Sequence, residues 1–399
     1  MSISVPAKIT PELLVWARET MQLELDTAAE RIGVDPTRLA GWEGGEVISI
    51  AQLRKVANAY RRPFSSFYLP SRPPEERPPH EYRRIHAADE FQNVAELALA
   101  IRMADFRRES YIDLASEEGR SLSEFQLRAN QSENPEAIAA RIRTALNVSL
   151  ETQLSWGDKR VAFNGWRRAI ERKGTLIFLF QGVDEREARG ISLNYSLLPV
   201  ISVNSQDAYA ARSFTLFHEL VHILLRKPGV CDISEHYKRK SSDQAVEVFC
   251  NAVAAEALVP TGDFNSFVGR ARSTADDLDD LLGKISRRYS VSEAMSLRRL
   301  LSCRHISQAV FEKKHDELLD LYQRQKEIKL ASKKPTPISI STRVFSALGL
   351  KFVGQVVRSY QKGHITLSDV VDYVGVKSNH FGKIRQAYED RLTNRGVID

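Results

Sequence analysis

The sequence has few cysteines and no long apolar run. Its 399 residues contain three cysteines, Cys231, Cys250 and Cys303, whose spacing matches neither a disulfide framework nor a cysteine-rich zinc site. There is no signal peptide and no apolar stretch near the roughly twenty residues that a transmembrane helix needs. These absences exclude a disulfide-stapled secreted scaffold and a membrane-spanning protein. We therefore expect a cytoplasmic protein without a membrane partner.

Charge and hydrophobic content are those of an ordinary globular chain. Hydrophobic residues make up 43% of the sequence and charged residues 27%, so two or three domains with real cores are expected. The formal net charge of +6 is a mild basic excess that is spread along the chain. It is compatible with nucleic acid binding but does not by itself indicate it.

A His-Glu-x-x-His motif at residues 218–222 is the strongest chemical signal. His218 and His222 are four residues apart, so an α-helix places both imidazoles on one face, one turn apart. Glu219 follows the first histidine, where its carboxylate can reach a water on the metal rather than the metal, the general-base position of a metallopeptidase. The motif therefore predicts a zinc site on a buried helix.

A catalytic zinc site needs a third protein ligand, and residues 243–260 offer one. Glu247 and Asn251 are four residues apart, so Glu247 can bind the metal while Asn251 hydrogen-bonds a histidine ligand. Glu256 is the rival ligand, but it lies nine residues beyond Glu247, on about the opposite side of the helix. Cys250 is a further alternative, although packing is the more common use of such a residue.

These segments resemble the ImmA/IrrE zinc metallopeptidases. The resemblance covers about residues 155–310 and is carried by residues 212–222, by the strand-like residues 198–204 and by residues 247–260. It implies a compact gluzincin-like domain that acts by limited proteolysis of a regulatory protein.

The resemblance also implies a role for each site residue. Zn²⁺ would bind His218, His222 and Glu247, and Glu219 would act as the general base in zinc-assisted peptide hydrolysis. Asn251 stands where many gluzincins have aspartate. An amide brings no charge, so the histidine ligand that it contacts would be somewhat less basic.

Short helices are expected before the peptidase region. Residues 27–43 predict a helix, a turn at Gly33 and a second helix, which resembles an Xre-type helix-turn-helix, and we assign residues 1–69 to this domain. The start of its second helix offers Thr37 and Arg38 to DNA bases.

DNA contact by this domain is not the only interpretation. Asp35, Glu43 and Glu46 lie close to Thr37 and Arg38, and Glu24 and Asp26 lie at the start of the preceding helix, where a phosphate contact would prefer a neutral or basic group. These acidic groups would repel the DNA backbone. Residues 10–60 could bind DNA, or they could form a protein-docking or dimerisation module. Dimerisation through this module would give a homodimer.

The rest of the chain divides by composition. Residues 70–85 are proline-rich and predict an extended linker, residues 86–310 the metallopeptidase domain with a helical lead-in, and residues 311–399 a helical C-terminal region. Overall we expect a mainly α protein with a small β-sheet, of the α+β class. Strands are predicted at residues 175–180, 188–195 and 198–203, and an edge strand could pair with an extended substrate.

Three further groups of residues have two interpretations each. His236 and Tyr237 could donate to the oxyanion of a tetrahedral intermediate, or belong to a surface loop. Arg212 is more readily a cap or an ion-pair partner at the helix start than a catalytic group. Residues 365–381 resemble a second helix-turn-helix-sized pair, and the lysines and arginine in and after it could contact phosphates or form a solvated face.

The expected function combines these elements. An Xre-type module ahead of an ImmA/IrrE peptidase resembles regulators encoded with toxins or mobile elements. We expect a zinc-dependent endopeptidase that cleaves a repressor, a toxin or antitoxin partner, or its own linker. The alternative is a DNA-binding, antitoxin-like regulator whose zinc domain is a sensing or structural module.

Overall fold

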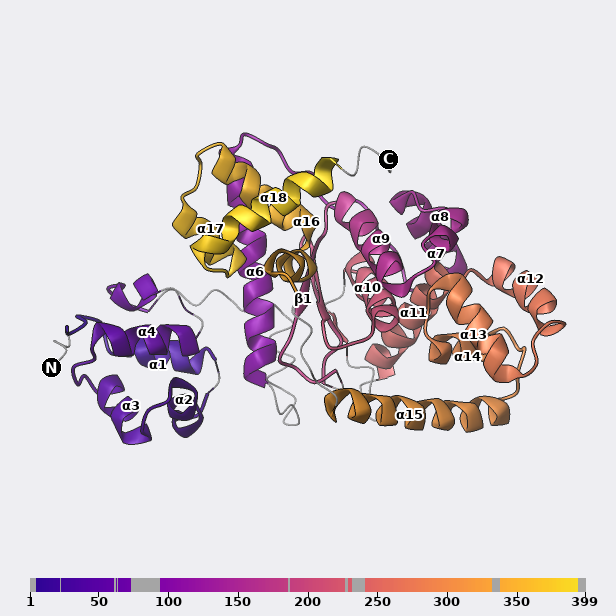
Figure 1. Ribbon diagram of the computed structural model, residues 1–399, viewed down its shortest axis with the longest axis horizontal. Helices are drawn as coiled ribbons and strands as arrows, with labels where there is room; N and C mark the ends of the chain where they lie inside the picture. The colour runs from indigo at the N-terminus through magenta and orange to yellow at the C-terminus, as the bar shows by residue number, and fades with distance from the viewer. Residues whose placement is uncertain are drawn as a thin grey trace. The chain divides into compact units, whose positions relative to one another are not determined.

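The computed structural model describes residues 5–21, 23–60, 62, 64–72, 94–185, 187–226, 229–231, 241–331 and 338–393. These residues are mostly helical with one small sheet, as expected for the α+β class (Figure 1). The chain divides into two compact units, Met1–Met103 and Ala104–Asp399. Most of the linker expected at residues 70–85 lies outside the described residues.

The N-terminal unit is a group of short helices. Asp35 caps α3 by accepting a hydrogen bond from the Thr37 amide, and Pro36 occupies the first helical position. Arg18 on α1 donates to both carboxylate oxygens of Glu43 on α3, at 2.8 and 3.0 Å, and so ties these two helices together. The helices are α1 (Glu12–Glu19), α2 (Leu25–Ile32), α3 (Pro36–Glu43) and α4 (Ile50–Ala59), followed by the 3₁₀ helix η1 (Phe64–Tyr68).

The second unit contains the sheet and most of the helices. Its helices are α6 (Val94–Glu117, from Ala104 on), α7 (Pro135–Leu146), α8 (Leu150–Ser155), α9 (Lys159–Arg172), α10 (Tyr209–Leu224), α11 (Ser241–Leu258), α12 (Thr261–Arg272), α13 (Leu278–Tyr289), α14 (Glu293–Ser302), α15 (Gln308–Ala331), α16 (Ile340–Gln361), α17 (Leu367–Val374), the 3₁₀ helix η2 (Ser378–His380) and α18 (Phe381–Thr393).

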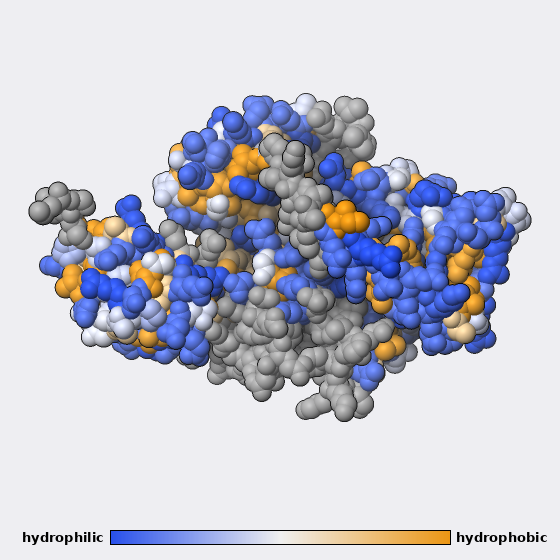
Figure 2. All heavy atoms as spheres, turned by 60° about the horizontal axis from the view of Figure 1, so that its bottom comes forward, coloured by the Kyte–Doolittle hydropathy of each residue, from blue (hydrophilic) through white to orange (hydrophobic). Residues whose placement is uncertain are grey.

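None of the described helices is by itself long and apolar enough to cross a membrane. One pair of helices, Gln244–Leu258 and Thr261–Arg272, which is bent by 61°, would be long and apolar enough when taken together. In the view of Figure 2, hydrophobic residues form small patches among hydrophilic ones.

The sheet has four strands in the order β1-β3-β2-β4. The strands β1 (Leu176–Phe180), β2 (Gly190–Leu193) and β3 (Val200–Asn204) agree with the three predicted segments, whereas β4 (Gly229–Cys231) was not expected. β1 pairs with β3 in parallel, and β2 pairs antiparallel with both β3 and β4. Every residue of β1, β2 and β3 is buried, because helices cover both faces of the sheet.

The main core lies between the sheet and the helices that carry the candidate site. α10 packs against α11, α9, β2 and β3, and α11 also packs against α7. Trp166 of α9 stands edge-on to Phe217 of α10, with ring centroids 4.8 Å apart. This packing fixes the position of α10 along its length, and therefore the position of the side chains that it carries.

The helix α16 packs against β1, an edge strand of the sheet. Arg167 of α9 donates to the carbonyl oxygen of Ile177 in β1 and, at 2.6 Å, to that of Ser346 in α16. α16 is kinked at Gly349, whose φ of 77° and ψ of 159° lie in a region that is open to glycine alone. A Cβ at Gly349 would lie 2.4 Å from a carboxylate oxygen of Glu171 and 3.2 Å from the Ile177 carbonyl oxygen. The kink thus lets the α16 backbone approach the strand.

We expect Gly349→Ala to destabilise the protein by roughly 3 kcal/mol or more, because it adds a steric clash to backbone strain. Gly363→Ala is the matched control: its φ is 76°, but a Cβ there meets nothing within 4 Å. The control should cost only about 1 kcal/mol. Urea unfolding followed by circular dichroism measures both, and equal losses of stability in the two variants would contradict a close approach at Gly349.

Candidate metal centre

The helix α10 carries three buried ionisable side chains. His218 and Glu219 are fully buried and His222 is 2% exposed. Burial of such groups costs free energy unless they are paired or bind a metal, so stability alone does not account for this arrangement. Arg212 lies near the start of the helix and donates to the carbonyl oxygens of Asp207 and Ser205. It therefore holds the loop before the helix, which agrees with the structural rather than catalytic role expected for it, although its partners are loop carbonyl oxygens and not the helix amides.

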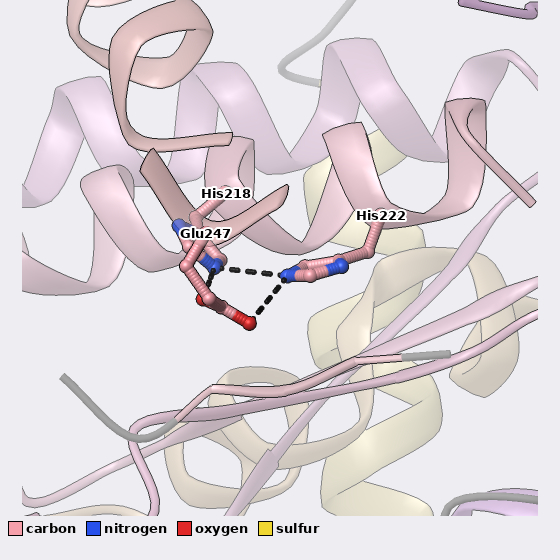
Figure 3. A group of neighbouring side chains, drawn as sticks. All are labelled: His218, His222 and Glu247. Atoms are coloured by element: carbon pink, nitrogen blue, oxygen red, sulfur yellow. Dashed lines mark hydrogen bonds and ion pairs between the residues drawn. The ribbon is translucent and has the colours of Figure 1, made fainter. Parts of the chain in front are cut away.

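The neighbouring helix α11 brings a carboxylate to the two histidines (Figure 3). One oxygen of Glu247 lies 3.1 Å from Nε2 of His218, and the other lies 3.6 Å from Nε2 of His222. The two Nε2 atoms are 3.0 Å apart. Two imidazoles and one carboxylate from two helices thus converge on one point.

The spacing of these donors fits a zinc ion. The three ligand atoms lie within 4.8 Å of one another. Zinc–ligand bonds of about 2.0–2.1 Å at tetrahedral angles would place pairs of ligand atoms about 3.3–3.4 Å apart, and the three separations above bracket this value. Two histidines and one glutamate are also the donor set of a catalytic zinc site, which keeps a fourth position for water or substrate. His218, His222 and Glu247 could therefore hold Zn²⁺.

Glu247 is held in its charged form. Desolvation by burial raises the pKa of its carboxyl group, but the hydrogen bonds and charge interactions with His218 and His222 outweigh it, so the pKa is lowered overall. An ionised carboxylate is the form that binds a metal.

Asn251 lies one turn after Glu247 and contacts the other side of the first imidazole. Its Oδ1 is 2.9 Å from Nδ1 of His218. The amide oxygen can only accept, so Nδ1 carries the proton and Nε2 presents its lone pair to the position between the ligands. The geometry therefore suits the outer-sphere role expected for Asn251.

The structure adds one residue that the sequence analysis missed. Gly190, the first residue of β2, lies directly against the side chain of Glu219. A Cβ at Gly190 would lie 2.8 Å from Oε1 of Glu219 and 2.4 Å from Cγ2 of Thr215. Only glycine leaves room for the Glu219 carboxylate here. A glycine that opens a buried strand is the available sequence signal, because it often marks a close backbone approach.

The rival ligands are used elsewhere. Glu256 forms an ion pair with Arg299 at 2.6 Å and accepts hydrogen bonds from Thr261. Cys250 is buried in the main hydrophobic core. His236 and Tyr237, the expected oxyanion donors, lie outside the described residues.

The residues proposed to contact DNA lie at the start of α3. The Thr37 hydroxyl donates to Asp35, while Arg38 is exposed and lies 3.7 Å from Glu46. Glu43, expected to repel phosphates, is instead paired with Arg18 inside the N-terminal unit.

Comparison with known proteins supports this interpretation of the site. Residues 171–301 match a peptidase family described as the IrrE N-terminal-like domain. That segment includes α10, α11 and all three candidate ligands. A stretch of 103 residues, 25% of the chain, is 32% identical to the radiation response metalloprotease IrrE of Deinococcus deserti. The match spans 35% of that relative's length. Together these similarities support a metallopeptidase domain of the ImmA/IrrE family.

Zinc analysis tests the assignment of the third ligand. We expect about one zinc per purified chain, and we expect His218→Ala and Glu247→Gln to lose most of it because each removes a donor. Glu256→Gln is the control on the same helix, and it should retain the metal. Elemental analysis by mass spectrometry gives these ratios; zinc lost from Glu256→Gln and kept by Glu247→Gln would reverse the assignment.

Substitution of Asn251 tests its role behind His218. Asn251→Leu should weaken zinc binding about 10–100-fold, because the imidazole loses its hydrogen-bond acceptor. Asn251→Asp should bind zinc more tightly than the wild type, since a carboxylate makes the imidazole a better donor. Competition with a chromogenic chelator measures both affinities. An unchanged affinity in Asn251→Leu would remove Asn251 from the site.

Proposed function

We propose that the chain is a zinc-dependent endopeptidase that regulates another protein by limited proteolysis. The observation that supports this most directly is the convergence of His218, His222 and Glu247, with Glu219 next to them on α10. The similarity of residues 171–301 to a peptidase family agrees with it.

Each residue of the site has a defined task in this proposal. Zinc bound there supplies Lewis acidity and lowers the pKa of a water molecule. Glu219 accepts the proton of the attacking water and delivers it to the leaving amide nitrogen. Gly190 leaves the space in which the Glu219 carboxylate lies. Asn251 orients His218 through the hydrogen bond to Nδ1.

The sheet offers a place for an extended substrate. Among the described strands, β1 and β4 are at the two edges. The Ile177 carbonyl of β1 is already bound by Arg167, and α16 packs against that strand. β4 is therefore the edge that we propose for backbone pairing with a substrate, and it also contacts α10, which carries the histidines.

The N-terminal unit would deliver the peptidase to its target. The helices α2 and α3 pack together and are connected by a turn at Gly33, which supports a helix-turn-helix module as part of this proposal. Such a module would bring the peptidase to a repressor, a toxin or antitoxin, or DNA. Cleavage of the chain's own linker is a further form of the same proposal.

The test is a comparison of Glu219→Gln with the wild-type protein. The amide cannot accept the proton, so cleavage should fall about 10²–10⁴-fold while zinc is retained. New protein N-termini, identified by mass spectrometry in cells that express each form, reveal the substrate. The same cleavage is then measured with purified proteins. If the same new termini appear with Glu219→Gln, the proposed hydrolysis is refuted.

Gly190→Ala provides a second, independent variant. The added methyl group should displace Glu219 and lower the cleavage rate without loss of zinc. Gly262→Ala is its control, because a Cβ there has no neighbour within 4 Å. If Gly190→Ala cleaves at the same rate as this control, the Glu219 position is not set by β2.

A further inference from the structure

The last three helices repeat the spacing of the first three. α17 begins at Leu367 and α2 begins at Leu25, 342 positions earlier, and both helices have eight residues. Five residues separate α1 from α2, and five separate α16 from α17. The following helical segments, η2 and α3, begin at Ser378 and Pro36, which again differ by 342 positions. The order and spacing of helix, turn and helix are therefore the same at both ends of the chain.

The two turns also have the same backbone conformation. Gly33 has φ 76° and ψ 47°, and Gly375 has φ 70° and ψ 36°. Two residues later, Asp35 has φ −70° and ψ 141°, and Lys377 has φ −67° and ψ 147°. The turn between α17 and η2 thus has the same backbone conformation as the turn between α2 and α3, although the sequences differ.

The buried positions correspond as well. At the shared offset, four of the five buried apolar residues of α2 and α3 have a buried counterpart, whereas Ala29 corresponds to the half-buried Val371. The pairs are Ala28 with Val370, Ile32 with Val374, Leu39 with Phe381, and Trp42 with Ile384. α16 packs against both α17 and α18, as the third member of the unit (Figure 1).

The segments that follow the two turns differ in charge. Residues 35–46 contain one arginine and three acidic residues, a net charge of −2. Residues 377–388 contain two lysines, one arginine and no acidic residue, a net charge of +3. The segments that follow the two turns therefore differ in charge: residues 35–46 carry an acidic excess, although Glu43 is paired with Arg18, and residues 377–388 carry a basic one.

The residues around η2 and the start of α18 present side chains that are not used within the described part of the protein. Lys377, Asn379 and Lys383 are exposed, and their side chains make no hydrogen bond or ion pair within the described residues. Gly382, between the last two, is open on its outer side, since a Cβ there would have no neighbour within 4 Å. Residues 377–383, which comprise η2 and the first turn of α18, thus combine two cations with an amide and leave room for close approach.

Several acidic groups gather around Tyr373 of α17. Burial raises the pKa of the Tyr373 phenol, and the carboxylates of Asp369, Glu117, Asp113 and Asp372 add to the effect. Tyr373 packs against Phe106 of α6, with ring centroids 6.1 Å apart. Two further acidic residues, Glu389 and Asp390, lie in the second half of α18, where Glu389 is 3.9 Å from Arg385, and the start of α18 remains basic.

We propose that α16, α17, η2 and α18 form a second helix-turn-helix unit, which binds double-stranded DNA through η2 and the start of α18. The N-terminal residues of the second helix of such a unit enter the major groove. Asparagine pairs there with adenine edges, and lysines neutralise phosphates. The acidic residues beside α3, Asp35 and Glu46, make residues 35–46 the weaker DNA-binding segment of the two.

The experiment measures binding of the full-length protein to a fluorescent duplex of about 30 base pairs over a series of salt concentrations. The double variant Lys377→Ala/Lys383→Ala should reduce the slope of log affinity against log salt by about 1.8, or about 0.9 per phosphate contact. Its affinity at 0.1 M salt should fall about tenfold or more. Arg38→Ala, in the N-terminal unit, should change neither quantity.

A charge-matched control separates a local site from bulk electrostatics. Lys313→Ala/Arg324→Ala removes two cations from exposed positions of α15 and should leave the slope unchanged. Equal losses in this control and in the α18 variant would overturn the proposal, as would a wild-type protein that does not bind the duplex at low salt. Because all four side chains are exposed, unfolding temperatures and zinc content should be unchanged, so failure of this proposal is distinguishable from failure of the metal site.

Discussion

The convergence of His218, His222 and Glu247 is the constraint on which the rest of the second unit depends. Their side chains come from two helices, and all of them lose most of their contact with water. Burial of ionisable groups is unfavourable unless a partner compensates for it. The packing of α10 against α11 supplies the geometry, and the hydrogen bond between Asn251 and His218 fixes the orientation of one imidazole. A divalent ion bound between the three side chains would offset the remaining free-energy cost of their burial.

Local periodicity explains how much of the site could be predicted. A spacing of four residues places His218 above His222, and the same spacing relates Glu247 to Asn251, so each pair follows from helix geometry alone. The preference for Glu247 over Glu256 followed from the same angles, and the ion pair of Glu256 with Arg299 agrees with it. The partnership of Gly190 with Glu219 could not be predicted, because it joins a strand and a helix through tertiary packing.

In the sheet, too, the features set by local sequence could be predicted, and those set by tertiary packing could not. The strands β1, β2 and β3 could be predicted from their apolar and β-branched residues, whereas β4 has only three residues and little pattern. The closure of β1 depends on Arg167, Gly349 and the carbonyl of Ile177, which are far apart in sequence. The C-terminal region is accordingly part of the second unit rather than an appendage. The turns at Gly33 and Gly375 were both detectable, but their common offset and opposite charge become meaningful only when their burial patterns are compared.

His218, His222 and Glu247 are expected to surround the metal with two nitrogens and one oxygen. X-ray absorption at the zinc edge of the purified protein tests it most directly, because nitrogen or oxygen ligands lie at about 2.0–2.1 Å and sulfur ligands at about 2.3 Å. We expect a four-coordinate zinc with two imidazole nitrogens, one carboxylate oxygen and one solvent oxygen. A sulfur ligand, or a protein that does not bind zinc, would contradict it.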